Sequence, residues 1–212
     1  MRPARDLSLY LVTDRELAGA RPIEAVVEAA VRGGVTAVQL REKHCSTREF
    51  IAIGRALQPQ LARCGVPLIV NDRVDVALAI GADGVHLGQS DMEPATARNL
   101  LGANAVIGFS VETMEQAVRA AALDIDYLGV GPIFATATKP DVAAPWGLEK
   151  LAALRARSRH VLVAIGGIDA ANAAPVMAAG ADGIAVVSAV CAAADVEQAA
   201  RALRAVVKAG RR

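Results

Sequence analysis

The chain has 212 residues, of which 54% are hydrophobic, and its formal net charge is +1. This length is enough to bury one large core, so we predict a single domain that spans residues 1–212. The small net charge, without blocks of like charge, and the 3% of aromatic residues argue against a nucleic acid or a membrane surface as partner. The composition therefore favours a protein that acts on small molecules.

Two features of the sequence bear on its compartment. The cysteines, Cys45, Cys64 and Cys191, are odd in number and widely spaced, which indicates reduced thiols in a cytoplasmic protein. The basic N-terminus precedes the apolar run 7–12, but this run is too short for a signal peptide and ends at Thr13, so we expect a first strand there. We find no segment that approaches the length of a transmembrane helix.

Short apolar runs alternate with helical patterns along the chain, which is typical of parallel strands joined by helical crossovers. Eight strands are expected, at Leu9–Val12, Ala37–Leu40, Pro67–Val70, Gly84–Leu87, Val106–Phe109, Tyr127–Val130, Val161–Ile165 and Ile184–Val187. Ser46 and Glu49 have the pattern of a capping box, ahead of a helix in which Pro59 predicts a kink or an early end. Asp195 is expected to cap the last helix.

An internal repeat supports this count of strands. The sequence GADGV at 81–85 recurs as GADGI at 180–184, with weaker echoes at 34–38 and 124–128. These segments precede strands two, four, six and eight, where each helix turns back into the sheet and glycine supplies a left-handed cap. We therefore predict an α/β fold, a single-domain (βα)8 TIM barrel, in which the active site lies at the carboxyl ends of the strands.

Two carboxylates stand at the ends of adjacent predicted strands. Asp72 follows the third strand and Asp91 follows the fourth. Neighbouring parallel strands lie about 4.8 Å apart, so both side chains can share one cation. One or two carboxylates with substrate phosphate oxygens are the ligands that Mg²⁺ prefers. We predict a magnesium site at Asp72 and Asp91; the alternative is that Asp72 caps the following helix and Asp91 lies in a solvated loop.

The second strand ends in three side chains that point the same way along an extended segment, Gln39, Arg41 and Lys43. Two fixed cations and an amide suit a diphosphate, because Arg offers a planar fork and Lys a point charge. The alternative interpretation is a loop of ordinary surface charges in which Glu42 is the ion-pair partner.

Hydroxyl and cationic side chains follow the fifth and sixth strands over the same opening, namely Ser110, Thr136, Thr138 and Lys139. A second anion site is expected at the ends of the seventh and eighth strands. Gly167 follows the seventh strand, and Val187 and Ser188 end the eighth, where barrels hold phosphate through backbone amides and a helix N-terminus. This side is sized for a monophosphate.

His86 lies on the fourth strand beside the opening. It could polarise a substrate or act as a general acid or base. The alternative is a structural histidine whose ring nitrogens are satisfied by neighbouring groups.

With these residues in view, the chain resembles the thiamine-phosphate synthase family. Six segments carry the resemblance: YLVTD from Tyr10, VQLREK from Val38, VNDRVDVALAIGADGVHLGQSD from Val70, GPIFATATK from Gly131, IGGI from Ile165 and GADGIAVVS from Gly180. The resemblance implies a cytoplasmic transferase that condenses 4-amino-5-hydroxymethyl-2-methylpyrimidine diphosphate with a thiazole phosphate. The products are thiamine phosphate and pyrophosphate, and the diphosphate leaves before the thiazole nitrogen attacks.

The resemblance also implies roles for individual residues. Asp72 and Asp91 would bind magnesium, and Arg41, Lys43, Ser110 and Lys139 would be catalytic. The pyrimidine diphosphate would be held by Gln39, Arg41, Lys43, Asn71, Ser110 and Lys139. The thiazole phosphate would be held by Thr136, Thr138, Gly167, Val187 and Ser188. Leu40, Glu42 and Ala137 lie between these positions and are included in the predicted substrate site.

One departure from the family pattern concerns Glu112, which stands where the family usually has a histidine. The related thiazole tautomerases depend on that histidine and tend to lack the second acidic ligand and the TxTK element. This chain lacks the histidine and has both the second acidic ligand and the TxTK element, which favours the synthase. An isomerase of that type, or a non-catalytic barrel that binds thiamine precursors, are the alternatives. The sequence leaves open the carboxylation state of the thiazole and the choice between a monomer and a homo-oligomer.

Overall fold

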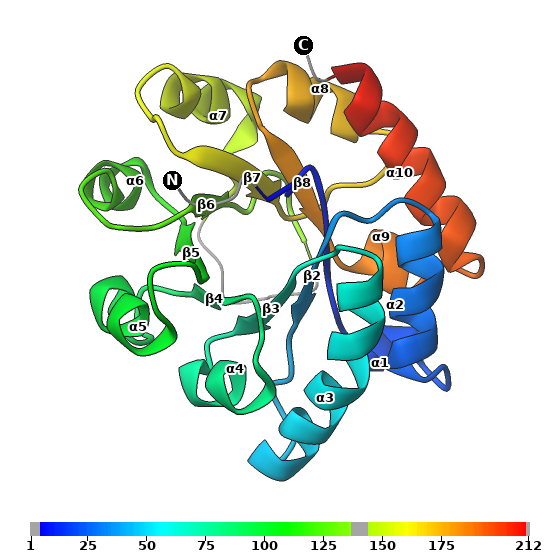
Figure 1. Cartoon of the computed structure of the whole chain (residues 1–212). Helices are drawn as coiled ribbons and strands as arrows, with labels where there is room; N and C mark the ends of the chain where they lie inside the picture. The colour runs from blue at the N-terminus through cyan, green and yellow to red at the C-terminus, as the bar shows by residue number, and fades with distance from the viewer. Residues whose placement is uncertain (1–4, 137–143, 211–212) are drawn as a thin grey trace.

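The structure is a computed structural model that describes residues 5–136 and 144–210. In this part of the chain, eight parallel strands close into a barrel in sequence order, β1 to β8 (Figure 1). The strands are β1 Leu9–Val12, β2 Ala37–Leu40, β3 Leu68–Asn71, β4 Gly84–Leu87, β5 Val106–Val111, β6 Tyr127–Val130, β7 Val161–Ile165 and β8 Gly183–Val186. The predicted (βα)8 barrel is therefore confirmed.

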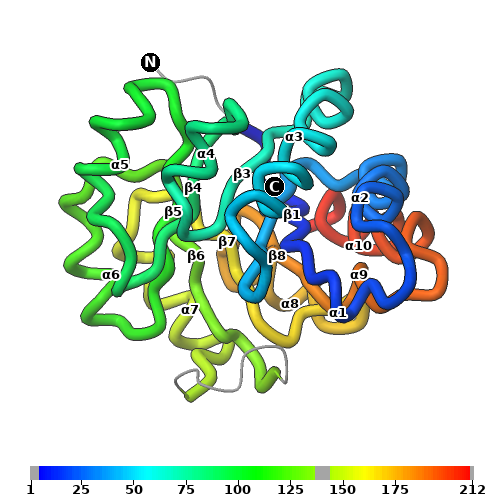
Figure 2. The backbone as a smooth tube through the Cα atoms, turned by 90° about the horizontal axis from the view of Figure 1, so that it is seen from below, coloured from blue at the N-terminus to red at the C-terminus, as the bar shows by residue number. Residues whose placement is uncertain are grey.

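Helices form a ring outside the barrel, with α5 and α6 on one side of it and α2 and α10 on the other (Figures 1 and 2). They are α1 Arg15–Ala18, α2 Ile23–Arg32, α3 Thr47–Arg63, α4 Val74–Ile80, α5 Pro94–Leu101, α6 Met114–Ala120, α7 Gly147–Arg155, α8 Ala173–Ala178, α9 Ser188–Cys191 and α10 Val196–Gly210. The short helix α9 is an addition to the simple alternation, and it begins directly after β8.

Five of the eight predicted strands have the observed bounds. The third and eighth strands shift by one residue, and the fifth extends to Val111, which places Ser110 within the strand. The helix containing Pro59 runs on to Arg63, so the predicted early end is wrong. Pro59 faces solvent between the buried residues Leu57 and Leu61, so packing on both sides holds the helix together.

The predicted helix caps are present, with one exception. Ser46 Oγ accepts the N–H of Glu49 at 3.2 Å, but the Glu49 carboxylate pairs with Arg15 at 2.7 Å and does not complete the capping box. Asp195 accepts the N–H of Gln198 at 2.9 Å, as predicted for the last helix.

Residues alternate along the strands between two buried layers. Leu9 and Leu11 pack with the helices in the outer layer, whereas Tyr10, Ile69 and Tyr127 belong to a smaller cluster inside the barrel. Period-two alternation of a strand produces this division. The side chains near the carboxyl ends of the inner layer form the floor of the site described below.

The internal repeat closes the amino-terminal end of the barrel. In each of three copies an aspartate before an even-numbered strand accepts an N–H from the first or second residue of the preceding strand: Asp83 from Leu68 at 2.9 Å, Asp126 from Ile107 at 2.8 Å and Asp182 from Leu162 at 2.8 Å. In the first copy Thr36 does the same for Leu9 at 3.0 Å. These side chains accept backbone N–H groups at the starts of the strands. A buried N–H needs an acceptor, and this explains why the repeat has a polar residue at this position.

The second glycine of the repeat serves close approach of neighbouring backbones. A Cβ on Gly84 would lie 1.9 Å from the carbonyl oxygen of Val106, and one on Gly183 would lie 2.1 Å from that of Leu7. A larger residue at either position would push adjacent strands apart.

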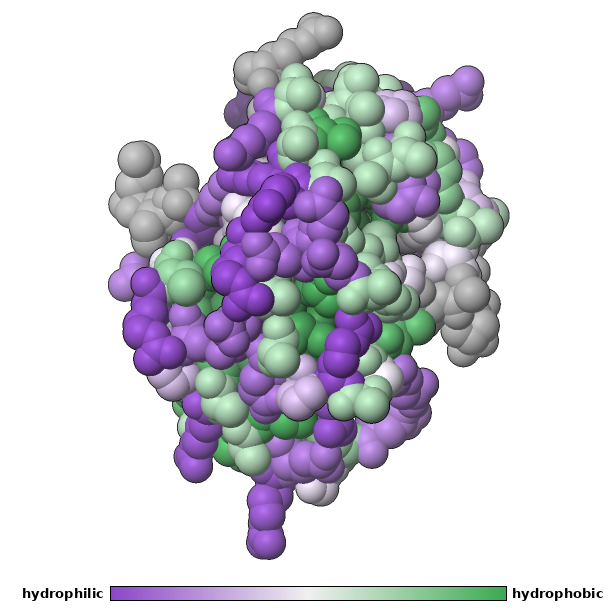
Figure 3. All heavy atoms as spheres, turned by 90° about the vertical axis from the view of Figure 1, so that its right-hand side faces the viewer, coloured by the Kyte–Doolittle hydropathy of each residue, from purple (hydrophilic) through white to green (hydrophobic). Residues whose placement is uncertain are grey.

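The helices direct their polar faces outwards, to solvent. Figure 3 shows the face that includes α2 and α10, where hydrophilic side chains run between smaller hydrophobic patches. Val196, Ala200, Leu203 and Val207 of α10 are buried against the barrel. Over the described residues, we find no helix with an apolar stretch long enough to cross a lipid bilayer.

Candidate active site

A cavity of about 500 Å³ lies at the carboxyl ends of the barrel strands. This volume is in the range of small-molecule sites. Most predicted site residues line it together: Gln39, Arg41, Lys43, Asn71, Asp72, Asp91, Ser110, Thr136, Gly167, Val187 and Ser188. Side chains from opposite walls of the barrel therefore converge on one space.

Two predicted site residues point elsewhere. Leu40 is fully buried in the outer hydrophobic layer, because alternation along β2 directs it away from the barrel interior. The Glu42 carboxylate pairs with Arg15 at 2.8 Å, and burial raises its pKa. Neither side chain lines the cavity, so a contact of Leu40 or Glu42 with substrate would have to come from the backbone and stays a prediction.

Three further predictions, Ala137, Thr138 and Lys139, lie outside the described residues. Their neighbour Thr136 lines the cavity, so the described chain leads to its rim at this point.

The two predicted metal ligands lie beside one another. Asp72 directly follows β3 and Asp91 follows β4, and these strands pair directly. Burial raises the pKa of Asp91, and the nearby Asp72 carboxylate raises it further, whereas the Gly88 N–H, at 2.7 Å from Asp91 Oδ2, lowers it. Because the two carboxylates of Asp72 and Asp91 repel one another, a cation bound between them would be favoured.

The ammonium of Lys43 already shows how a cation fits beside these carboxylates. Lys43 Nζ lies 2.6 Å from Asp72 Oδ2. The donor set of two carboxylates, open to the cavity, suits a hard divalent ion that completes its shell with water and phosphate oxygens. Over the described chain we find no cluster of three His, Cys, Asp or Glu side chains, so a closed cage for a softer metal is not built there.

Asp72 adopts a backbone conformation that few side chains tolerate. Its φ is +61°, the one positive φ of a non-glycine residue among those described. Asp and Asn are the non-glycine residues that tolerate this region best. Helix α4 starts from Arg73 without a side-chain cap, so Asp72 does not cap that helix and its carboxylate is directed to the cavity instead.

Among the described residues that line the cavity, acidic side chains outnumber basic ones. The cations are Arg41 and Lys43, and the carboxylates are Asp72, Asp91 and Glu112. Arg41 also lies 4.0 Å from Asp14. Since the carboxylates outnumber these cations, phosphate groups entering here need further positive charge from outside this set.

The loop after β7 is held in shape by its own polar groups. Gly167 has a φ of +65°, and its carbonyl accepts the side-chain amide of Asn172 at 2.8 Å. A Cβ on Gly167 would lie 2.7 Å from the carbonyl oxygen of Ala135. This glycine is therefore required by the packing of two loops, whatever the cavity binds.

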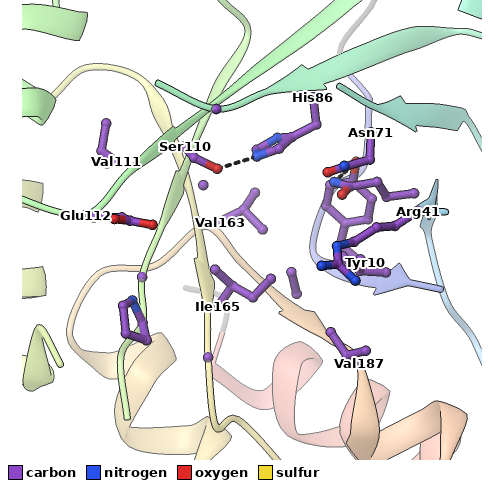
Figure 4. Close-up of a pocket in the computed structure, with 18 of the residues that line it drawn as sticks. Tyr10, Arg41, Asn71, His86, Ser110, Val111, Glu112, Val163, Ile165 and Val187 are labelled. Atoms are coloured by element: carbon purple, nitrogen blue, oxygen red, sulfur yellow. Dashed lines mark hydrogen bonds between the residues drawn. The ribbon is translucent and has the colours of Figure 1, made fainter. Parts of the chain in front are cut away.

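His86 of β4 and Ser110 of the neighbouring β5 point towards one another (Figure 4). His86 Nε2 lies 2.8 Å from Ser110 Oγ, and Nδ1 lies 2.8 Å from the hydroxyl of Tyr127. Both ring nitrogens thus have a hydroxyl within hydrogen-bond distance, and His86 and Ser110 both line the cavity.

Comparison with known proteins decides the family. Residues 9–190 match the family model described as thiamine monophosphate synthase. The chain belongs to the thiamine-phosphate synthase family. It is 58% identical over 203 residues to the thiamine-phosphate synthase of Albidiferax ferrireducens, covering 96% of this chain and 93% of the relative. It is 59% identical over 202 residues to that of Chloroflexus aurantiacus, covering 95% and 93%.

A solved structure agrees with the sequence relatives. Thiamine phosphate pyrophosphorylase from Pyrococcus furiosus superposes with a TM-score of 0.89 at 42% identity, over 97% of this chain and 98% of that one. As a member of the thiamine-phosphate synthase family, the chain is a transferase of thiamine biosynthesis. The family resemblance inferred from the sequence segments is confirmed, and the synthase is favoured over the isomerase.

Several residues of the synthase cavity were missed by the sequence interpretation. They are Tyr127, Ser90, Gln116, Gly129, Val163 and Ile165. Four of them were within reach, because Tyr127 and Gly129, and likewise Val163 and Ile165, have the spacing of residues on one strand face. Gln116 comes from α6, and its one sequence signal is the Thr113 to Gln116 capping box.

Glu112, the departure from the synthase pattern, lies on the side of the cavity opposite Arg41 (Figure 4). Its backbone is held on both sides: its N–H donates to Gln116 Oε1 at 2.6 Å and its carbonyl accepts the indole N–H of Trp146 at 2.8 Å. Trp146 is buried behind this segment and does not line the cavity.

Proposed function

We propose that the cavity binds the two substrates of thiamine phosphate synthesis side by side, with the pyrimidine diphosphate over β2 to β5 and the thiazole phosphate over β6 to β8. The cations Arg41 and Lys43 stand over the first half, and the hydroxyls of Thr136 and Ser188 over the second. The observation that supports this division most is the pairing of Asp72 and Asp91 beside Lys43, all in the first half.

Magnesium fits this first half. Asp72 and Asp91 would hold the ion, and when bound it would neutralise charge that develops on the departing diphosphate. The excess of carboxylates over cations among the described lining residues supports the same assignment, because a divalent ion supplies the positive charge that the diphosphate needs.

The residues of the chain act by binding and orientation. Arg41 and Lys43 would hold the diphosphate oxygens while the bond between the pyrimidine methylene carbon and the diphosphate oxygen breaks. Asn71 and Ser110 would hold the pyrimidine end, and Gly167, Val187 and Ser188 the thiazole phosphate. The thiazole nitrogen then donates its electron pair to the methylene carbon, and its attack depends on position alone. Thr138 and Lys139 belong to this proposal on the family resemblance.

Incubation of the protein with both substrates tests this function. We expect thiamine phosphate and pyrophosphate in equal amounts, and neither product when one substrate or Mg²⁺ is omitted. Turnover of a thiazole phosphate alone into an isomer would favour the tautomerase. Binding of both compounds without either product would favour a carrier.

A further inference from the structure

A chain of side-chain hydrogen bonds crosses the barrel interior beneath the cavity. The Gln39 side-chain nitrogen donates to Tyr10 Oη at 3.3 Å, and the two tyrosine hydroxyls, Tyr10 and Tyr127, lie 2.9 Å apart. Tyr127 Oη lies 2.8 Å from His86 Nδ1, and His86 Nε2 lies 2.8 Å from Ser110 Oγ. Five residues from five strands thus connect β2 to β5 through the centre of the barrel.

The backbone leaves room for this crossing. A Cβ on Gly108 of β5 would lie 2.1 Å from Tyr127 Cζ and 2.5 Å from His86 Nδ1. A Cβ on Gly129 of β6 would lie 2.8 Å from His86 Cε1. Any other residue at these two positions would displace the rings, so the strands themselves are fitted to the chain of hydrogen bonds.

Contacts between the aromatic rings also hold Tyr10, Tyr127 and His86 in place. The Tyr10 and Tyr127 rings meet edge to face with centroids 5.8 Å apart, and the His86 ring stacks on Tyr127 at 5.4 Å. Tyr10 and Tyr127 are each 1% exposed. Burial raises the pKa of both hydroxyls, so each keeps its proton.

The chemistry of the first donor sets the direction of every following bond. An amide nitrogen can donate and cannot accept, so Tyr10 Oη accepts from Gln39, and the Tyr10 O–H is then directed to Tyr127 Oη, 2.9 Å away. Tyr127 then donates to His86 Nδ1, which must carry a lone pair. In the neutral imidazole the proton is therefore on Nε2, which donates to Ser110 Oγ and leaves the Ser110 proton free to point into the cavity.

We propose that Gln39 is a positioning residue that acts at a distance: it sets the direction of this chain, holds His86 as the Nε2–H tautomer and makes the Ser110 hydroxyl a donor to the substrate. The tautomer is a property of the free protein. Only the nature of the group that accepts from Ser110, an acceptor atom of the pyrimidine diphosphate, rests on the proposed function.

Nitrogen NMR of histidine-labelled protein tests the direction without substrate, since two-bond nitrogen–proton correlations distinguish the tautomers of a neutral imidazole. The chain has three histidines, and His44→Gln and His160→Gln assign the His86 signals by elimination. We expect Nε2–H in the unaltered protein. An Nδ1–H form there would overturn the proposal with no variant needed.

Gln39→Glu should reverse the direction of the hydrogen bonds in this chain, because a carboxylate accepts a hydrogen bond from Tyr10 where the amide donated one. Spectra are recorded up to about pH 10, above the pKa of about 8–9 that a buried glutamate can reach, so that the new carboxyl is ionised. We expect His86 to change to the Nδ1–H form, in which its Nε2 accepts from Ser110 and the serine proton is withdrawn from the cavity. The matched control is Gln116→Glu, which adds the same charge to the cavity lining while keeping the Oε1 acceptor of its capping box; there we expect the Nε2–H form.

A kinetic arm connects the tautomer to the reaction. We expect Gln39→Glu to lower kcat about as much as Ser110→Ala does, and the double variant to be no slower than Ser110→Ala alone, because both changes remove one interaction. A lower kcat with an unchanged His86 tautomer would overturn the positioning role. If the unaltered protein makes no thiamine phosphate, the proposed function fails while the spectra still decide the direction of the chain.

Discussion

The ammonium of Lys43 lies 2.6 Å from a carboxylate oxygen of Asp72, joining the ends of β2 and β3 across the mouth of the cavity. The two side chains are 44% and 23% exposed, so solvent screens their attraction. Ion pairs of this kind contribute at most about 1 kcal/mol. A divalent cation can therefore replace Lys43 beside Asp72 at low cost, which releases the ammonium for the diphosphate.

This exchange predicts an effect of Lys43→Ala on magnesium binding. In the absence of substrate, Mg²⁺ should bind more tightly to the variant, by up to about fivefold, because a competing cation is gone. Calorimetric titration with Mg²⁺ measures this change, and Lys43→Arg, which keeps the charge, is the control. Weaker binding to Lys43→Ala would mean that the lysine does not occupy the metal position.

The two halves of the cavity predict separate effects on the two substrates. Ser188→Ala should raise the KM for thiazole phosphate by about tenfold or more, the usual loss for a hydrogen bond to a charged group, and leave that for pyrimidine diphosphate near normal. Ser90→Ala, the same change in the other half of the cavity lining, should not alter the thiazole phosphate KM. Equal effects of Ser188→Ala on both substrates would contradict the division. Gly167→Ala is unsuitable here, because the new methyl group would clash with Ala135.

Glu112 is not expected to transfer a proton in the reaction. Loss of the diphosphate requires no prior proton transfer, so Glu112→Gln should keep most of the activity in a steady-state assay. Glu112→Ala is a useful companion, since the backbone contacts to Gln116 and Trp146 do not depend on the side chain. A loss in kcat within the range of about 10² to 10⁴ that general acid–base catalysis supplies would assign Glu112 a catalytic role.

The aspartates of the repeat predict unequal losses of stability. Asp126 accepts from Ile107 and from the guanidinium of Arg98, whose side chain is 9% exposed. Asp126→Ala should lower the free energy of unfolding by about 2 kcal/mol, because the buried Arg98 loses the nearer of its two carboxylate partners and keeps only Asp124, at 3.3 Å. Asp182→Ala should cost only about 1 kcal/mol, since Asp182 is 45% exposed and its pair with Arg155 is screened. Urea unfolding followed by circular dichroism measures both, and equal losses would contradict this reading of the repeat.

The sequence predicted the barrel well because its signals are local and repeated. Each βα unit carries its own apolar run and turn, and the GADG segments mark where helices return to the sheet. The early end at Pro59 failed because tertiary packing of Leu57 and Leu61 outweighs the lost hydrogen bond. Bounds at strand ends shifted by one residue where pairing with the neighbour, and not composition, decides them.

The site was predictable where chemistry and strand ends coincide, as at Arg41, Asp72 and Asp91. The side chains of Leu40 and Glu42 point away from the cavity, because residues alternate along β2 and the segment that follows it. The connection from Gln39 to Ser110 could not be read from sequence, because it joins strands that are distant along the chain and meet only inside the closed barrel.

The measurement that tests the two-carboxylate site most directly is the rate of pyrophosphate release as Mg²⁺ is titrated, for the unaltered protein, Asp72→Asn and Asp91→Asn. Asparagine tolerates the positive φ of residue 72, so the fold should be retained. We predict that kcat falls by about a hundredfold or more in each variant, as for loss of one preorganised electrostatic contact, and that saturation requires more Mg²⁺. Unchanged rates with unchanged magnesium dependence in both variants would contradict the assignment of Asp72 and Asp91 to the metal.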